Sequence, residues 1–313
     1  MDCKAIAAVL KRELGLRWDP VALKMLRPGE AKPASCVQPA TRLRHCQSVI
    51  AARRGNALYM PPRSHACPDG AGILGLVEMS AKLRSGELYL LFRKMPDLAT
   101  AQQMIAERPE FPSGAYAATA LAPLKDADFE PDVVIFTLWP EQAMWLCCAQ
   151  TYATGRRQEF RLSGFNSACS DLVVTPMQSD AMNISLGCYG SRAASEIDDF
   201  ELYLSLPASL LEKITPALQK LGKKSIPESR RKIYLPPVLD RVGADLAENE
   251  KTEIKVNEEI CIGCGLCAAF CPTSVLELVE KNGRFFSAAT APERCSHCYT
   301  CVGQCPARAL QIV

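Results

Sequence analysis

In the first two thirds of the chain, the spacing of apolar residues predicts helices in some segments and strands in others. A stripe with a spacing of three or four residues predicts an amphipathic helix at the start, and its members are Ile6, Val9, Leu10 and Leu14. Further helices are predicted over residues 42–54, 98–107, 141–152 and 209–220. Strands are predicted over residues 21–26, 58–60, 117–121, 133–136, 159–162, 183–186 and 201–204. Because these elements do not alternate regularly, the predicted fold class is α+β, with mixed helices and strands, rather than a doubly wound parallel sheet.

The charge pattern then divides the chain. A basic stretch from Lys220 to Lys232 is followed by Pro236-Pro237 and by an acidic run from Asp240 to Glu259. This change of composition is typical of an interdomain connection. Docking of an acidic redox partner on the basic stretch is the alternative to a solvated linker. We predict an N-terminal domain, a linker and a C-terminal domain over residues 1–222, 223–252 and 253–313.

Composition and charge restrict the possible partners and location. The 313 residues, 48% of them hydrophobic, suit a folded protein of two domains. With 36 basic and 34 acidic residues, the net charge of +2 gives no electrostatic case for nucleic-acid binding. The uncharged stretch between Lys4 and Lys11 is too short for a secretory signal, and no apolar run suits a bilayer span. We therefore expect a cytoplasmic protein without membrane insertion.

Cysteine dominates the candidate chemistry, with sixteen residues against three histidines. In a reducing compartment, clustered cysteines are more often metal ligands than disulfides. Eight of them form two copies of C-x2-C-x2-C-x3-C-P, which begin at Cys261 and Cys295. Zinc also binds paired C-x2-C motifs, but it does not require the third cysteine and the C-P step in both copies.

Each copy is predicted to supply ligands to two [4Fe-4S] clusters. Three closely spaced thiolates hold one cubane, and the fourth, which precedes proline, binds the other. The predicted ligands are Cys261, Cys264, Cys267 and Cys305 for cluster 1, and Cys295, Cys298, Cys301 and Cys271 for cluster 2.

On these motifs, residues 253–313 resemble bacterial-type ferredoxins that carry two [4Fe-4S] clusters. The resemblance implies a pseudo-twofold ferredoxin fold, one-electron transfer at low potential and a redox partner protein. Between the motifs, residues 275–280 and 285–287 predict a hairpin that closes on Asn282-Gly283. We interpret His297, inside the second motif but not at a ligand position, as a surface residue or one that tunes the field at the cluster.

The N-terminal domain, over roughly residues 3–222, resembles an uncharacterised prokaryotic family called domain of unknown function 169. The resemblance rests on Arg44-His45-Cys46-Gln47, Ser64-His65-Ala66-Cys67-Pro68, Pro131-Asp132-Val133-Val134, Pro140 to Met144, Cys169-Ser170-Asp171 and Asn183 to Arg192. It implies a fold and a set of motifs rather than a reaction, so the substrate stays unknown.

Four cysteines of this domain share a setting beside Gly, Pro, His or Arg, where a helix begins or a loop turns; they are Cys46, Cys67, Cys169 and Cys188. Gly187 and Gly190 would let backbone N–H groups approach the Cys188 thiolate. Nearby arginines, expected to lower the thiol pKa values, are Arg44, Arg63 and Arg192. We interpret the four thiols as ligands of a third [4Fe-4S] cluster. Buried core thiols and a dithiol redox site are the alternatives.

Other features carry weaker signals. The match to G-x-G-x-x-G over residues 70–75 follows a Pro-rich loop and lacks a suitably placed acidic residue. A tight turn into a packed helix is therefore favoured over a dinucleotide site. His45 and His65 are candidates for a proton relay, with surface or structural histidines as the alternative. The remaining cysteines are expected in a helical core (Cys147-Cys148) and in end or loop positions (Cys3, Cys36).

Three functions fit this sequence. The first is an oxidoreductase, of an anaerobic type, in which the ferredoxin domain exchanges electrons with a redox site in the N-terminal domain. The second is a non-catalytic electron-transfer subunit whose N-terminal domain docks onto a separate enzyme. The third is an iron–sulfur sensor or assembly factor. Electron transfer is common to the first two.

Overall fold

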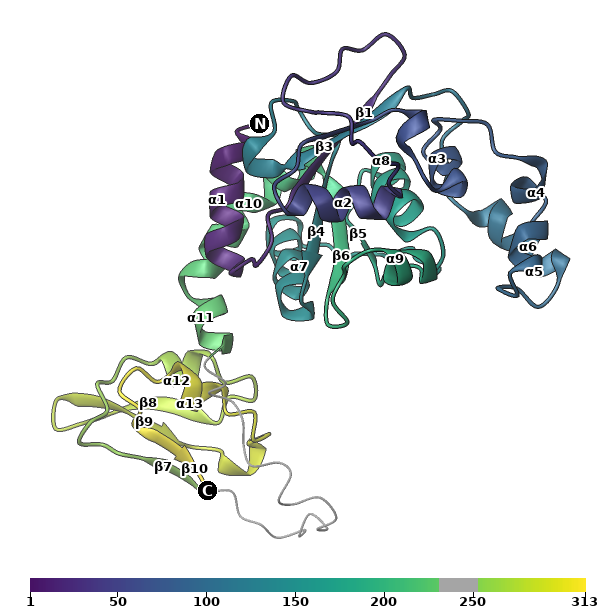
Figure 1. Ribbon diagram of the computed structural model, residues 1–313. Coiled ribbons are helices and arrows are strands. Elements are labelled where there is room, and N and C mark those ends of the chain that lie inside the picture. The colour runs from purple at the N-terminus through teal and green to yellow at the C-terminus, as the bar shows by residue number, and fades with distance from the viewer. Residues whose placement is uncertain (231–252) are drawn as a thin grey trace. The chain divides into compact units, whose positions relative to one another are not determined.

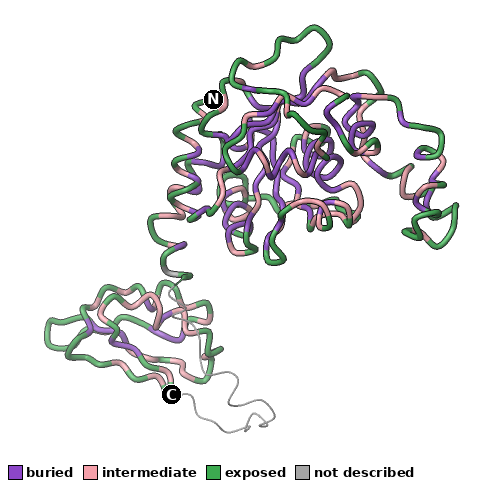
Figure 2. The backbone as a smooth tube through the Cα atoms, viewed as in Figure 1, coloured by how far each residue is buried: buried purple, intermediate pink, exposed green. Residues whose placement is uncertain are grey.

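The computed structural model describes residues 1–230 and 253–313, and the chain divides into two compact units, Met1–Ile226 and Pro227–Val313. Each unit has its own buried core (Figure 2). The predicted linker over residues 223–252 contains the described helix α11 (Ser225–Arg230), and its residues 231–252 lie outside the described part of the chain.

The N-terminal unit is built on one six-stranded sheet in the order β2-β3-β1-β4-β6-β5, and every pairing is antiparallel (Figure 1). Its strands are β1 (Val21–Leu26), β2 (Leu58–Met60), β3 (Ala118–Pro123), β4 (Val133–Leu138), β5 (Asn183–Ser185) and β6 (Leu202–Pro207). An antiparallel sheet with irregularly interspersed helices confirms the α+β prediction.

Period-two alternation along the central strands sends side chains to two cores. In β1, Val21, Leu23 and Met25 join one core while Ala22 joins the other. The second core is covered by α1 (Cys3–Leu14), α7 (Pro140–Thr154) and α10 (Ala208–Lys223), and Ile226 of α11 packs into it.

The opposite face carries the helices that bear the four candidate cysteines. Into the core of this face pack α2 (His45–Arg53), α3 (Pro68–Ile73) and the π-helix η3 (Ser167–Val174), and α9 (Tyr189–Ala194) lies against α2. The other helices of the unit are α4 (Ala81–Arg84), α5 (Glu87–Leu91), α6 (Leu98–Glu107) and α8 (Thr175–Ser179), with short 3-10 turns η1 (Pro62–Ser64) and η2 (Leu124–Asp126). One sheet face therefore positions all four candidate thiols.

The predicted strand over residues 159–162 is wrong, because this segment forms no ladder. The side chain of Asn183, on β5, takes both backbone groups of Arg161: Oδ1 accepts from its N–H at 2.8 Å, and Nδ2 donates to its carbonyl at 2.8 Å. A side chain thus replaces the neighbouring strand that a ladder would need. Most other predicted elements are present with ends shifted by a few residues.

Over residues 253–313, the C-terminal unit has two antiparallel strand pairs and two short helices. Strand β7 (Ile254–Val256) pairs with β10 (Leu310–Ile312), and β8 (Leu276–Lys281) pairs with β9 (Arg284–Ala289). The β8–β9 hairpin turns at Asn282-Gly283, where both residues have positive φ (57° and 74°), as a type I′ turn requires. The helices are α12 (Leu266–Ala269) and α13 (Thr300–Gln304), and the 3-10 turn η5 (Pro292–Arg294) precedes α13.

Candidate metal centres

The eight C-terminal cysteines surround two separate hollows. One is lined by Cys261, Cys264, Cys267 and Cys305, and the other by Cys271, Cys295, Cys298 and Cys301. The fourth cysteine of each motif therefore lies with the first three of the other motif. This is the crossed grouping that the two-cluster motif requires.

The two motifs repeat the same backbone path. Gly263 and Gly265 have φ of 65° and 73°, and the residues 34 positions later, His297 and Tyr299, have φ of 53° and 56°. The left-handed region is unfavourable for non-glycine residues. The second motif nevertheless adopts the same path with His297 and Tyr299 where the first motif has glycine. His297 is exposed, in keeping with a surface position.

The cysteine before each proline accepts an equivalent backbone hydrogen bond. The N–H of Val275 donates to Cys271 Sγ at 3.3 Å, and the N–H of Ala309 donates to Cys305 Sγ at 3.2 Å. Such N–H···S bonds orient a thiolate and stabilise its negative charge. Both fourth cysteines are thus held in matching settings.

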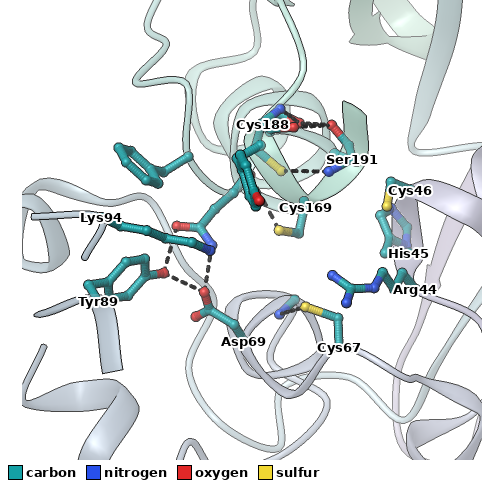
Figure 3. A pocket seen from close by; sticks show the side chains of 17 residues that line it. Arg44, His45, Cys46, Cys67, Asp69, Tyr89, Lys94, Cys169, Cys188 and Ser191 are labelled. Atoms are coloured by element: carbon teal, nitrogen blue, oxygen red, sulfur yellow. Dashed lines mark hydrogen bonds between the residues drawn. The ribbon is translucent and has the colours of Figure 1, made fainter. Parts of the chain in front are cut away.

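In the N-terminal unit, Cys46, Cys67, Cys169 and Cys188 line one pocket. Figure 3 shows their sulfur atoms around a common space, toward which the side chain of Arg44 extends. The cavity measures about 100 Å³. Residues up to 142 positions apart in sequence, from Cys46 to Cys188, are brought together here.

Local structure presents each thiol to this pocket. Cys67 is the N-cap of α3 and its Sγ accepts from the N–H of Gly70 at 3.4 Å. Cys188 is the N-cap of α9 and its Sγ accepts from the N–H of Ser191 at 3.3 Å. Cys46 lies in the first turn of α2, and Cys169 lies in the π-helix, an element that is frequent at functional sites.

Burial, more than the arginines, sets the pKa values of these thiols. Desolvation and the neighbouring thiols Cys188 and Cys67 raise the pKa of Cys46 to about 12, and Arg44 lowers it only slightly. Burial also raises the pKa values of Cys67 and Cys169. Arg44 lowers the pKa values of Cys46 and Cys67, as expected, but burial outweighs it, because a buried thiolate loses more solvation than one guanidinium returns.

Cys188 is the exception. Burial alone would raise the pKa of its thiol, but hydrogen bonds with Ser167 and Ser191 outweigh burial and lower it. The guanidinium of Arg192 donates to the backbone carbonyls of Leu186 and Glu201 at 2.8 and 2.7 Å.

His45 and His65 are buried, so the surface alternative for them is wrong. Their rings stack with centroids 6.3 Å apart. Desolvation lowers the pKa of His45 to about 3 and that of His65 to about 4, so both rings are neutral at pH 7. His45 lines the pocket, and within the described residues neither of its ring nitrogens has a hydrogen-bond partner.

The carboxylate of Asp69 ties the surrounding segments together. It accepts from the hydroxyl of Tyr89, from Asn166 Nδ2 at 2.7 Å and from Arg108 Nη1 at 3.1 Å (Figure 3 shows the first two bonds). Asn166 begins the π-helix, and its carbonyl accepts from Cys169 Sγ at 3.3 Å. Asp69 therefore couples the helix that Cys67 caps to the helix that holds Cys169. Sequence reasoning missed this residue, although it lies two positions after Cys67.

Asp69→Ala is expected to lower the free energy of unfolding of the N-terminal unit by about 1.5–3 kcal/mol, the value of buried hydrogen bonds to a charged group. Asp69→Asn should recover part of the loss, because an amide oxygen still accepts from Tyr89. Urea unfolding followed by tryptophan fluorescence measures both, since Trp18, Trp139 and Trp145 all lie in this unit. An Asp69→Ala protein as stable as the wild type would contradict this role.

The other cysteines singled out in the sequence lie outside the pocket, and the G-x-G-x-x-G match forms part of a packed helix. Cys36 is fully buried, while Cys3 and Cys147-Cys148 are partly buried against the core that α1, α7 and α10 cover. The G-x-G-x-x-G match forms helix α3 and the turn after it, as the packed-helix alternative expects. Its first glycine, Gly70, lines the cysteine pocket.

In the described chain, no three Cys, His, Asp or Glu side chains are close enough to share one metal ion, in either unit. The ligands of a cubane lie farther apart than those of a single ion, because each of the four thiolates binds a different iron atom. The cysteine sets are therefore compared with the needs of a cluster rather than those of a single ion.

Residues 9–217 match the model of the family described as uncharacterised ArCR, domain of unknown function 169, and residues 260–309 match a 4Fe-4S dicluster domain. The chain belongs to the domain of unknown function 169 family. Its C-terminal unit adds a ferredoxin domain, as the sequence motifs predicted.

Individual relatives match the two halves separately. An uncharacterised protein of Methanocaldococcus jannaschii is 31% identical over 201 residues, 64% of this chain and 86% of its own length. A ferredoxin of Pyrobaculum islandicum is 37% identical over 67 residues, 21% of this chain and 57% of its own length. An iron–sulfur component of a CoB–CoM heterodisulfide reductase of Methanopyrus kandleri is 31% identical over 78 residues, 25% of this chain and 10% of its own length. The C-terminal domain is thus an iron–sulfur electron-transfer domain with [4Fe-4S] clusters.

Within residues 1–230 and 253–313, no helix has both the length and the apolar character needed to cross a membrane.

Proposed function

We propose that the ferredoxin domain exchanges low-potential electrons with a third [4Fe-4S] cluster, held in the N-terminal domain by Cys46, Cys67, Cys169 and Cys188. The observation that carries this proposal is the convergence of these four thiols on one pocket. The ligand sets of the two C-terminal clusters are proposed as above, on the crossed grouping of their cysteines.

The residues of the pocket suit a thiolate-ligated cluster in three respects. Four soft sulfur donors are present, and a bound metal would deprotonate the buried thiols. Gly70 lies directly beside two of the sulfurs: a Cβ on it would be in van der Waals contact with the sulfurs of Cys67 and Cys169, at 3.6 and 3.8 Å. His45 offers a buried ring nitrogen without a partner among the described residues, able to donate to a sulfide or thiolate.

The chain's own residues would also balance the charge of the cluster, which when bound supplies one-electron redox chemistry. The side chain of Arg44 extends toward the thiols, and its charge acts on Cys46 and Cys67. The backbone N–H groups of Gly70 and Ser191 already donate to Cys67 and Cys188. Both features favour an anionic group at this place.

The fusion of the two domains supports the proposal. Covalent attachment raises the effective concentration of an electron donor at its acceptor without any new contact. The 201 aligned residues make up 86% of the M. jannaschii relative, so that protein has little room for a second domain of this kind. We infer that the N-terminal domain is a redox module to which this chain adds an electron donor.

Cys169→Ser tests the proposal. After anaerobic reconstitution, the variant is expected to contain about four fewer iron atoms per chain than the wild type, one cubane's worth. The matched control is Cys148→Ser, a thiol on α7 that does not line the pocket, and it should keep the wild-type iron content. Equal iron in both variants and the wild type would overturn the third cluster.

A further inference from the structure

The pocket extends beyond the four thiols to an aromatic outer wall. The rings of Tyr89 and Phe165 meet edge to face with centroids 6.1 Å apart, and Tyr189 also lines this part. In Figure 3, Tyr89 and Lys94 lie on the side of the pocket away from Cys46. Tyr189 and Lys94 are exposed, so this part faces the mouth.

The ammonium of Lys94 lies over aromatic rings, 5.2 Å from the centroid of Tyr189 and 5.6 Å from that of Phe92. Among the described residues that line the pocket, Asp69 is the one acid, and its carboxylate already accepts from Arg108, Tyr89 and Asn166. The carboxylate of Asp69 therefore already has hydrogen-bond partners other than Lys94. The positive charge at the mouth remains available to a ligand.

The two cations of the pocket have different surroundings. Arg44 lies near Cys46 and Cys67, whose thiolates would balance its charge once the proposed cluster is bound. Lys94 lies at the aromatic wall. A ligand that satisfies this outer part needs a negative charge for Lys94 and a flat apolar body for the rings of Phe165 and Tyr189.

We infer that the outer part of the pocket binds a small planar organic carboxylate, beside the third cluster. The inference rests on the proposed function for the identity of its neighbour, and it names the substrate class of that site. The carboxylate pairs with Lys94, and the flat body stacks on the aromatic wall. Inorganic phosphate would pair with the ammonium but leave the rings without a contact, so the rings distinguish the two anions.

Titration calorimetry on the anaerobically reconstituted full-length protein tests this with three probes. Benzoate carries both features, benzamide lacks the charge, and inorganic phosphate lacks the ring. We expect benzoate to bind about tenfold or more tightly than either of the others. In Lys94→Met, benzoate should weaken to the level of benzamide. Lys82→Met, at an exposed lysine of α4 that does not line the pocket, should bind benzoate like the wild type.

Phosphate binding as tight as benzoate, or benzoate binding that survives Lys94→Met, would overturn the inference. Iron is counted on the same samples, so the two proposals fail separately. Three clusters without benzoate binding refute the carboxylate site alone, and two clusters with Lys94-dependent benzoate binding refute the third cluster alone. Lys94 is exposed, so its replacement leaves the core intact.

Discussion

Cys305→Ser is expected to cost the protein the cluster of the first motif, although Cys305 belongs to the second. Cys305 lines the same hollow as Cys261, Cys264 and Cys267, and the N–H of Ala309 fixes its sulfur there. Serine is a harder ligand that cannot replace a thiolate on iron without loss of affinity. The iron content should fall by about four atoms per chain.

Spectra identify which cluster is lost. The electron paramagnetic resonance spectrum of reduced Cys305→Ser should match that of Cys264→Ser, because both variants lose the same cluster. It should differ from that of Cys298→Ser, whose thiol lines the other hollow. A spectrum that coincides with Cys298→Ser instead would show that each motif holds its own cluster, against the crossed grouping.

Glu201→Ala is expected to destabilise the N-terminal unit by about 3–5 kcal/mol, since it leaves a buried arginine without its partner. Arg53 Nη1 and Glu201 Oε2 lie 2.8 Å apart, and both side chains are 2% exposed. Glu201 also accepts from Trp18 Nε1 at 2.8 Å, and Arg53 lies 4.5 Å from the centroid of the Trp18 ring. The loss would be a large share of the roughly 5–15 kcal/mol that typically holds a domain folded.

This buried pair also supports the cysteine pocket. Arg53 is the last residue of α2, whose first turn contains Cys46. The backbone carbonyl of Glu201 accepts from Arg192 of α9 at 2.7 Å. Urea unfolding followed by tryptophan fluorescence measures the effect. Glu78→Ala, which removes an exposed partner of Arg84, is the control and should leave the midpoint unchanged. A Glu201→Ala midpoint equal to that of the control would contradict the assigned role.

The sequence predicted best what depends on local spacing. The two C-x2-C-x2-C-x3-C-P motifs and the Asn282-Gly283 turn are read within a few residues, and the family comparison confirms a dicluster domain. The strand over residues 159–162 failed because a tertiary contact, from Asn183, replaces its ladder. Local pattern cannot report such a contact.

The candidate site was predictable only in its cysteines. Their Gly, Pro and Arg neighbours singled out Cys67 and Cys188, but their convergence on one pocket depends on how four helices pack on the sheet. Burial likewise outweighed the expected lowering of the Cys46 pKa by Arg44, because desolvation is a property of the fold. Tyr89 and Lys94 carried no motif that would have marked them.

The number of clusters is the central claim, and an iron and acid-labile sulfide count on anaerobically reconstituted full-length protein tests it most directly. Each cubane contributes about four iron atoms, so three clusters predict about 12 iron and about 12 sulfide per chain. A count near 8 that does not change when Cys46, Cys67, Cys169 and Cys188 are each replaced by serine would contradict the account. The N-terminal domain would then be a docking or thiol-based module beside an ordinary ferredoxin.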